Sequence, residues 1–133
     1  MALLGGCCCG AVRYQTVEKT FNATLCHCPT CRRASAAPSV AWYTVRRTDY
    51  HITAGAPVRY ASSPGVTRTF CGACGTQLTY QRDDAPDELD VTVCSLDDPD
   101  RVAPVDHTFA MYRVAWDKPC DGLRDYARLR SEG

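Results

Sequence analysis

The sequence predicts a small, mainly β protein of the sandwich or barrel class. Short runs rich in Val, Thr, Tyr and Phe recur along the chain, and these residue types favour pleated, half-buried strands. Proline and glycine clusters separate the runs at short intervals, a spacing typical of sandwiches and barrels rather than of alternating strands and helices. Helix signals are scarce by comparison. We therefore expect short strands joined by tight turns.

Six runs carry the strand pattern, and a turn signal bounds most of them. The predicted strands are residues 11–17, 40–45, 58–61, 66–70, 77–81 and 89–93, and the turn signals lie at residues 38, 55–57, 62–65, 83–86 and 97–99. One helical turn is expected over residues 32–37, where Pro38 would end it. Residues 122–130 are expected to form either a short C-terminal helix or a packed tail. The aromatic residues Trp42, Tyr43, Tyr60 and Tyr80 on these strands are interpreted as core or as walls of a cleft.

Length and charge limit the organisation and the partners. The 133 residues suffice for one hydrophobic core and are too few for two domains of ordinary size, so a single domain over residues 1–133 is expected. Fifteen Lys and Arg balance fifteen Asp and Glu, giving a formal net charge of +0. No global field therefore attracts nucleic acid or anionic lipid, and small neutral partners fit better.

Ten cysteines stand out in a chain of this length. They indicate a disulfide scaffold in a secreted protein or metal sites in a reducing compartment. The first residues lack the basic segment and long apolar segment of a secretory signal, and no apolar run is long enough to span a bilayer. We therefore expect a cytoplasmic protein without a membrane partner, whose clustered cysteines bind metal.

Seven of the ten cysteines fall into three groups: Cys7 and Cys9 in GGCCCG, Cys26, Cys28 and Cys31 in CHCPTC, and Cys71 and Cys74 in FCGACG. In an extended chain Cys7 and Cys9 would point to the same face. The group at Cys71 reads as a zinc knuckle, in which Gly72 and Gly75 tolerate positive φ.

Two partitions of these ligands are open from spacing alone. In the first, Cys7, Cys9, Cys71 and Cys74 hold a structural zinc, and Cys26, Cys28 and Cys31 hold a second zinc with an open fourth position, as in catalytic sites. In the second, Cys28 and Cys31 join Cys71 and Cys74 across 39 residues in one zinc ribbon. The second partition leaves three well-placed thiols unused, which modestly favours the first.

Four stretches together resemble a known family. GGCCCGAVRY, CHCPTCRR, SSPGVTRTFCGACG and VCSLDDP with the following His107 occur in this order from about Gly5 to about Trp116, and the combination is more specific than any one motif. They resemble the glutathione-dependent formaldehyde-activating enzyme family, which also contains centromere protein V. The resemblance implies a β-rich, Mss4-like fold and the two-site partition of the zinc ligands.

The resemblance also implies an activity: condensation of formaldehyde with glutathione to S-hydroxymethylglutathione, classed in the reverse direction as a carbon–sulfur lyase. A small thiol, glutathione among the candidates, and an aldehyde are the expected substrates. Two alternatives stay open. One is a non-catalytic zinc-stabilised interaction module, as the presence of centromere protein V in the family permits. The other is a one-ion ribbon that binds nucleic acid, which the neutral charge disfavours.

Three other residues have both a functional and a structural interpretation. His27 lies between two ligands and is expected on the surface or beside the site rather than on the metal. His107 is interpreted as a proton shuttle near the open position or as a hydrogen-bonded structural histidine. Arg68 is interpreted as a contact for a substrate carboxylate or as the partner of an aspartate. No catalytic residue is assigned from sequence, and the seven cysteines are assigned as metal ligands.

Overall fold

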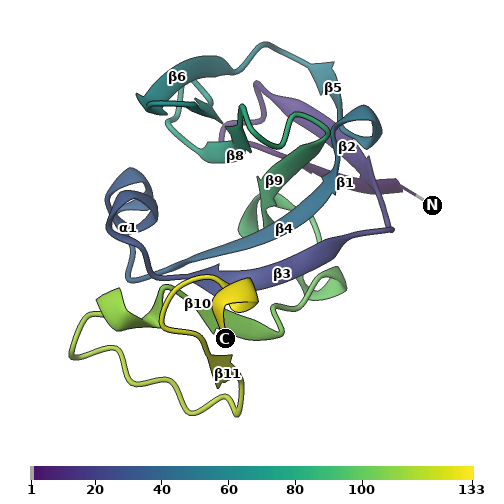
Figure 1. Cartoon of the computed structure of the whole chain (residues 1–133). Helices are drawn as coiled ribbons and strands as arrows, with labels where there is room; N and C mark the ends of the chain where they lie inside the picture. The colour runs from purple at the N-terminus through teal and green to yellow at the C-terminus, as the bar shows by residue number, and fades with distance from the viewer. Residues whose placement is uncertain (1) are drawn as a thin grey trace.

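The fold is described by a computed structural model that covers residues 2–133 (Figure 1). Across these residues the chain forms eleven strands, one α-helix and five short 3-10 helices. The predicted mainly β class is thereby confirmed, and the strands form two sheets. None of the helices in this described part has the length and apolar character needed to cross a bilayer.

The smaller sheet has three antiparallel strands in the order β1-β2-β5. These strands are β1 (Ala2–Gly6), β2 (Arg13–Val17) and β5 (His51–Ala54). Only β2 overlaps a predicted strand. The sheet lies at the N-terminal side of the molecule in Figure 1.

The larger sheet has eight strands in the order β11-β10-β3-β4-β9-β8-β7-β6. Its central pairs are antiparallel, whereas β10 runs parallel to both β3 and β11. The strands are β3 (Phe21–Cys26), β4 (Val40–Arg46), β6 (Val58–Ser63), β7 (Val66–Phe70), β8 (Gln77–Arg82), β9 (Glu88–Thr92), β10 (Asp106–Thr108) and β11 (Arg124–Asp125). This sheet carries all the predicted strands except that at residues 11–17.

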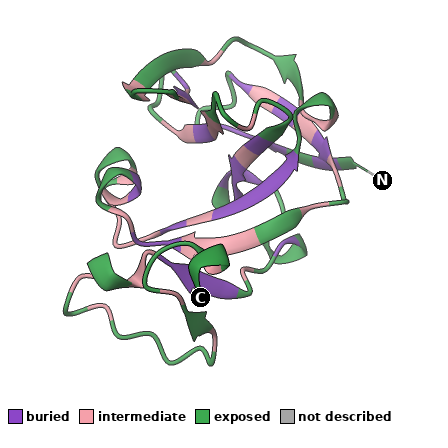
Figure 2. Cartoon of the chain, in the orientation of Figure 1, coloured by how far each residue is buried: buried purple, intermediate pink, exposed green. Residues whose placement is uncertain are grey.

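Successive side chains of β4 alternate between the two faces of the larger sheet, and each face packs in a different cluster. Tyr43 and Val45 are fully buried and pack in the main core with Leu78 and Val91. Trp42 points to the opposite face, because successive side chains of a strand alternate, and packs in a second cluster that contains cysteines. Figure 2 shows the buried residues running along β4 at the centre of the molecule.

The α-helix, α1 (Pro29–Ser35), follows β3 directly. It begins three residues before the predicted helical turn, because Pro29 at the first helical position has a φ suited to a helix start. It ends at Ala36, which adopts a left-handed conformation, two residues before Pro38. The 3-10 helices are η1 (Arg47–Asp49), η2 (Val93–Ser95), η3 (Pro99–Arg101), η4 (Ala110–Tyr112) and η5 (Arg130–Glu132).

The C-terminal segment packs along β3 and β10 and does not form an α-helix. Backbone hydrogen bonds join Phe109 N to Arg128 O (2.9 Å) and Ala110 N to Tyr126 O (2.9 Å). Of the two expectations for residues 122–130, the packed tail is the one observed. It brings the end of the chain to the rim of the second cluster.

Candidate metal centres and the cavity beside one of them

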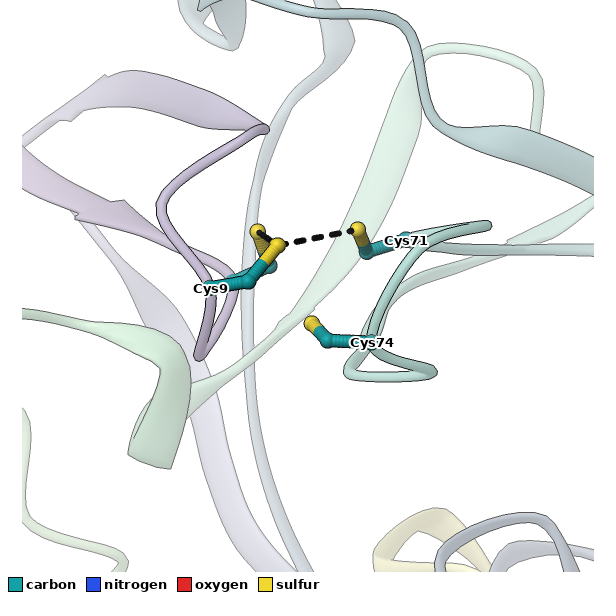
Figure 3. A group of neighbouring side chains, drawn as sticks. Cys9, Cys71 and Cys74 are labelled. Atoms are coloured by element: carbon teal, nitrogen blue, oxygen red, sulfur yellow. Dashed lines mark hydrogen bonds between the residues drawn. The ribbon is translucent and has the colours of Figure 1, made fainter.

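Four cysteine sulfurs meet where the two sheets approach each other. The Sγ atoms of Cys7, Cys9, Cys71 and Cys74, here called the four-sulfur cluster, all lie within 4.8 Å of one another. Cys9 Sγ is 3.6 Å from Cys7 Sγ and 3.8 Å from Cys71 Sγ (Figure 3). Tetrahedral zinc with Zn–S bonds of about 2.3 Å places its sulfurs about 3.8 Å apart. The donor set and its spacing therefore fit a zinc ion.

The first half of this cluster is a turn rather than the extended chain that was expected. After β1 ends at Gly6, the Gly10 N–H donates to the Cys7 carbonyl (3.1 Å), and Gly10 has a φ of +82°. Glycine adopts this left-handed conformation without steric cost. The turn, not strand alternation, brings Cys7 and Cys9 together.

The second half is the loop between β7 and β8. The Cys71 N–H donates to Thr76 O (3.0 Å) and the Gly75 N–H donates to Cys71 O (2.8 Å). Gly75 has the predicted positive φ (+83°), but Gly72 does not. Gly72 is instead close to Val58, whose Cγ2 would lie 2.8 Å from a Cβ at that position. The predicted knuckle is therefore present, with a different reason for one of its glycines.

Hydrogen bonds from Val12 and Thr76 favour the thiolate forms of two of the four sulfurs, those of Cys7 and Cys74. The Val12 N–H donates to Cys7 Sγ (3.2 Å), and this bond lowers the pKa of the Cys7 thiol. The Thr76 hydroxyl donates to Cys74 Sγ (3.2 Å) and is the main reason that the pKa of Cys74 falls to about 5. The same hydroxyl accepts the Cys8 N–H (3.0 Å), so it also joins the two loops.

The remaining three ligand candidates form a separate group. The Sγ atoms of Cys26, Cys28 and Cys31, here called the three-sulfur cluster, lie within 4.8 Å of one another. Among the described residues no fourth His, Cys, Asp or Glu joins them, and the alternative grouping of Cys28 and Cys31 with Cys71 and Cys74 is not formed. The cysteines thus lie together as in the two-site partition.

The start of α1 builds the three-sulfur cluster. Cys26 is the last residue of β3, Cys28 is the N-cap of α1, and Cys31 lies in its first turn. Cys28 Sγ accepts the Cys31 N–H (3.3 Å), one of the N–H groups that a helix start leaves without an intrahelical partner. These N–H groups also place partial positive charge beside the sulfurs.

Protons in the three-sulfur cluster are shared unequally. Hydrogen bonds from Cys26 first, and then from Cys31, lower the pKa of Cys28 well below its ordinary value. The pKa of Cys26 is raised, because its hydrogen bonds to Cys28 and Cys31 stabilise the thiol form and because Cys26 is buried. This donor set suits a thiophilic ion such as zinc.

A cavity of about 640 Å³ opens beside the three-sulfur cluster, on the face of the larger sheet opposite the main core. Its walls come from alternate strand positions and from the C-terminal segment. They include Cys26, Cys28, Cys31, Thr24, Trp42, Thr44, Arg68, Tyr80, Arg82, Glu88, Asp90, Thr108, Phe109 and Arg130. Its volume lies in the range that accommodates a small organic ligand. No member of the four-sulfur cluster lines it.

Arg68 is a charged residue that contacts the three-sulfur cluster. Its side chain is buried, with Nη2 3.7 Å from Cys31 Sγ and Nη1 donating to Gln77 Oε1 (2.7 Å). Its guanidinium carbon lies 5.0 Å from the Tyr80 ring centre and 6.0 Å from that of Trp42. None of the ion pairs among the described residues joins Arg68 to an aspartate, so the structural interpretation of Arg68 made from sequence is wrong.

His27 and His107 are fully buried and hydrogen-bonded to each other, with 2.8 Å between His27 Nε2 and His107 Nδ1. His107 Nε2 lies 2.8 Å from Asp121 Oδ2. Burial is the main cause that lowers the pKa of His27, which is therefore neutral at pH 7. Neither histidine lines the cavity. Of the placements expected for His27, the surface one is wrong because the side chain is buried, but His27 is not part of the three-sulfur cluster, as expected. For His107 the structure shows a buried, hydrogen-bonded histidine, which is the structural one of its two interpretations.

Sequence reasoning did not single out Asp90 and Thr44, which line the cavity, or Gln77, which holds Arg68 there. Asp90 Oδ1 accepts the Thr44 hydroxyl (2.6 Å), and Gln77 Nε2 donates to Ser35 Oγ (2.5 Å). The signal that would have found Thr44 and Asp90 is alternation, because both occupy the same face of their strands as Trp42. It required knowledge of which strands are neighbours.

Comparisons with known proteins agree with this geometry. A family model described as glutathione-dependent formaldehyde-activating enzyme matches residues 2–112. The chain is similar to a Rhodobacter sphaeroides protein of known crystal structure, with a TM-score of 0.63 and 22% identity over 93% of this chain and 100% of that chain. At this identity the likeness concerns the fold. No curated protein matches the chain.

Proposed function

Since this chain belongs to the glutathione-dependent formaldehyde-activating enzyme family, we propose that it is a zinc-dependent carbon–sulfur lyase. It forms or cleaves an S-hydroxymethyl-type adduct between a small thiol and an aldehyde at the three-sulfur cluster. Glutathione is the first candidate thiol, because the family description names it. We further propose that the protein acts in the cytoplasm, where reducing conditions keep its ten unpaired cysteines as thiols.

One observation carries this proposal: three cysteine sulfurs lie together at a cavity, without a fourth protein ligand among the described residues. Three protein ligands and one open position are the arrangement of catalytic zinc sites, whereas four closed ligands are that of structural ones. The four-sulfur cluster lies outside this cavity and suits the structural role. The open position beside Cys26, Cys28 and Cys31 is where we place the thiol.

Zinc held by three cysteines would stabilise an incoming thiol as its nucleophilic thiolate. The residues of the chain do the rest. Three thiolates exceed the charge of one divalent ion by one, and the buried guanidinium of Arg68 near Cys31 offsets that excess. Trp42 and Tyr80 wall the cavity with aromatic surface, which limits water around the reacting groups. The thiolate sulfur then attacks the aldehyde carbon, and the reverse step breaks the same bond.

The test is exchange NMR on the protein loaded with zinc. Glutathione, cysteine and a simple alkyl thiol are mixed in turn with ¹³C-formaldehyde, and the exchange rate between free and thiol-bound carbon is measured with and without protein. We expect the protein to accelerate exchange for at least one thiol, and elemental analysis to return two zinc ions per chain. A rate equal to the spontaneous one for all thiols would refute the proposal.

A second candidate function is a zinc-stabilised interaction module, and one observation favours it. Met111, Tyr112 and Trp116 are 54%, 44% and 72% exposed within one short segment, and neighbouring exposed apolar side chains are typical of interaction surfaces. The variant Cys28→Ser separates the two candidates. An enzyme loses turnover while staying folded, whereas an interaction module keeps its partner binding.

A further inference from the structure

Arg68 is a buried cation without a carboxylate partner. It is 5% exposed, and none of the ion pairs among the described residues includes it. The other two arginines on the cavity wall differ in this respect, because Arg82 pairs with Asp84 and Arg130 pairs with Asp106. A buried charge is costly unless it is compensated. The positive charge of Arg68 must therefore be compensated from the cavity side, by the cysteine sulfurs or by a bound ligand.

The side chain is held in one position by groups that leave its charge unneutralised. Gln77 Oε1 accepts from Nη1 (2.7 Å), and Gln77 is itself fixed by its bond to Ser35 Oγ (2.5 Å). The Tyr80 and Trp42 rings lie beside the guanidinium. Neutral hydrogen-bonding partners and aromatic rings orient a guanidinium and keep its remaining N–H groups available.

The guanidinium of Arg68 lies beside the three-sulfur cluster, where the proposed reaction takes place. Nη2 lies 3.7 Å from Cys31 Sγ, so a thiol bound among the same three sulfurs has its own sulfur close to the guanidinium. When that sulfur attacks an aldehyde, the oxygen that becomes negative is attached to the carbon bonded to the sulfur. Preorganised donors at a developing oxyanion are the largest single contribution in many enzymes.

We propose that Arg68 is a catalytic residue that donates hydrogen bonds to the aldehyde oxygen as it becomes an alkoxide. This inference rests on the proposed function. The thiol first loses its proton to water, the C–S bond forms as the C=O π pair moves to oxygen, and the alkoxide takes a proton from water. In reverse, the hydroxyl proton leaves, the π bond re-forms and the C–S bond breaks. Arg68 stabilises the same alkoxide in both directions and exchanges no proton.

The kinetic experiment compares Arg68→Gln, Arg68→Lys and the control Arg59→Gln by the same exchange NMR, each protein at two zinc ions per chain. Arg59 is a matched control, because it lies on the adjacent strand β6 and does not line the cavity. We expect Arg68→Gln to lower the rate constant at saturating thiol about 100-fold. Arg68→Lys, which keeps the charge without the planar fork, should lie between it and wild type. Arg59→Gln should match wild type.

A binding experiment gives a readout that does not depend on turnover. Calorimetry compares the binding of mercaptoacetate with that of ethanethiol. In mercaptoacetate a carboxylate is bonded directly to the carbon that bears the thiol, whereas ethanethiol has no charged group. Wild type should bind mercaptoacetate at least about tenfold more tightly, the size expected for a charge-assisted hydrogen bond. Arg68→Gln should lose this preference and still bind ethanethiol.

The outcomes separate the two proposals. If wild type does not accelerate exchange, the proposed function fails and the role of Arg68 fails with it. If wild type is active and Arg68→Gln and Arg68→Lys keep its rate, only this inference fails. Loss of zinc from both variants would show a structural role and would also overturn it.

Discussion

Asp90 is a carboxylic acid whose surroundings disfavour its charged form. It lies on the cavity wall with one hydrogen bond, from the Thr44 hydroxyl (2.6 Å), while Arg82 forms its ion pair with Asp84. Burial raises the pKa of Asp90 to about 6, and the charge of Glu88 adds to the shift against the opposing effect of Thr44. The folded protein thus holds a proton on Asp90 over a pH range in which the unfolded chain has lost it.

This shift gives a prediction with a definite sign. Since the folded pKa is raised, Asp90 lowers the free energy of unfolding as pH rises from about 4 to about 6, and the loss persists above pH 6. Asp90→Asn should therefore be more stable than wild type at pH 7.5, by about 1–3 kcal/mol. The difference should be smaller at pH 5. Urea denaturation of both zinc-loaded proteins at the two pH values measures it, and a pH-independent difference would contradict this origin.

Two glycines with positive φ differ in what surrounds them. Gly55 has a φ of +73°, and a Cβ there would lie 2.1 Å from the backbone oxygen of Ala11. Gly10 has a φ of +82° with open space around it. Gly10→Ala should cost about 1 kcal/mol from backbone strain alone. Gly55→Ala should cost several times as much, because β5 must move from β2. Thermal unfolding of the two variants compares them, and equal losses would show that the contact yields easily.

At the scale of elements, α1 ends with an alanine where glycine is preferred. Ala36 has a φ of 49° and caps the helix through its N–H, which donates to Arg33 O (3.3 Å). A left-handed residue at this position is usually glycine, because a Cβ adds strain there. Ala36→Gly should raise the free energy of unfolding by about 0.5–1 kcal/mol. Ala37→Gly, next in the chain, is the control and should not stabilise. A loss of stability in Ala36→Gly would contradict this account.

Strands that carry their own pattern were predictable, and strands defined by pairing were not. Residues 66–70 match β7 because Val, Thr and Phe lie between turn residues at both ends. β10 and β11 contain three and two residues. They exist only because β3 provides an edge for parallel pairing with β10, and β10 in turn provides one for β11. The same holds for β5, which pairs with β2 and is exposed throughout. Such strands form only through pairing with neighbouring strands, and a single sequence does not show which strands are neighbours.

The cysteine clusters were predictable for a different reason. Ligands two or three residues apart, as at Cys26, Cys28 and Cys31, are brought together by local chain geometry, so spacing is informative. The pairing of Cys9 with Cys71 depends on how two loops 62 residues apart meet, and spacing alone left it open. Arg68 and Asp90 flank Tyr80 in one row across β7, β8 and β9. This row of three side chains depends on the order of the strands in the sheet, which cannot be predicted from the sequence pattern.

At the scale of the whole molecule, the four-sulfur cluster joins the two sheets. One loop follows β1 of the smaller sheet, and the other connects β7 and β8 of the larger sheet. A polar contact that also joins strands of the two sheets is the buried hydrogen bond between the hydroxyl groups of Thr16 in β2 and Tyr43 in β4 (3.3 Å). The three-sulfur cluster, in contrast, lies within β3 and α1, which are consecutive in the chain. The two candidate zinc ions should therefore contribute very differently to stability.

Replacing one cysteine in each cluster tests this difference. Cys74→Ser removes a ligand that links the sheets, and zinc binding in such sites contributes folding energy directly. We expect this variant to lose its structural zinc and to show either no cooperative unfolding or a midpoint lowered by more than about 10 °C. Cys28→Ser should lose one zinc, keep the other and unfold cooperatively with a change below about 2 kcal/mol, because β3 and α1 remain joined by chain. Elemental analysis with thermal unfolding followed by circular dichroism measures both quantities. A link between distant segments restricts the unfolded chain more strongly than a local link does, so the four-sulfur cluster should stabilise the fold more. Equal destabilisation of the two variants would contradict this expectation and would mean that the three-sulfur cluster also maintains the fold.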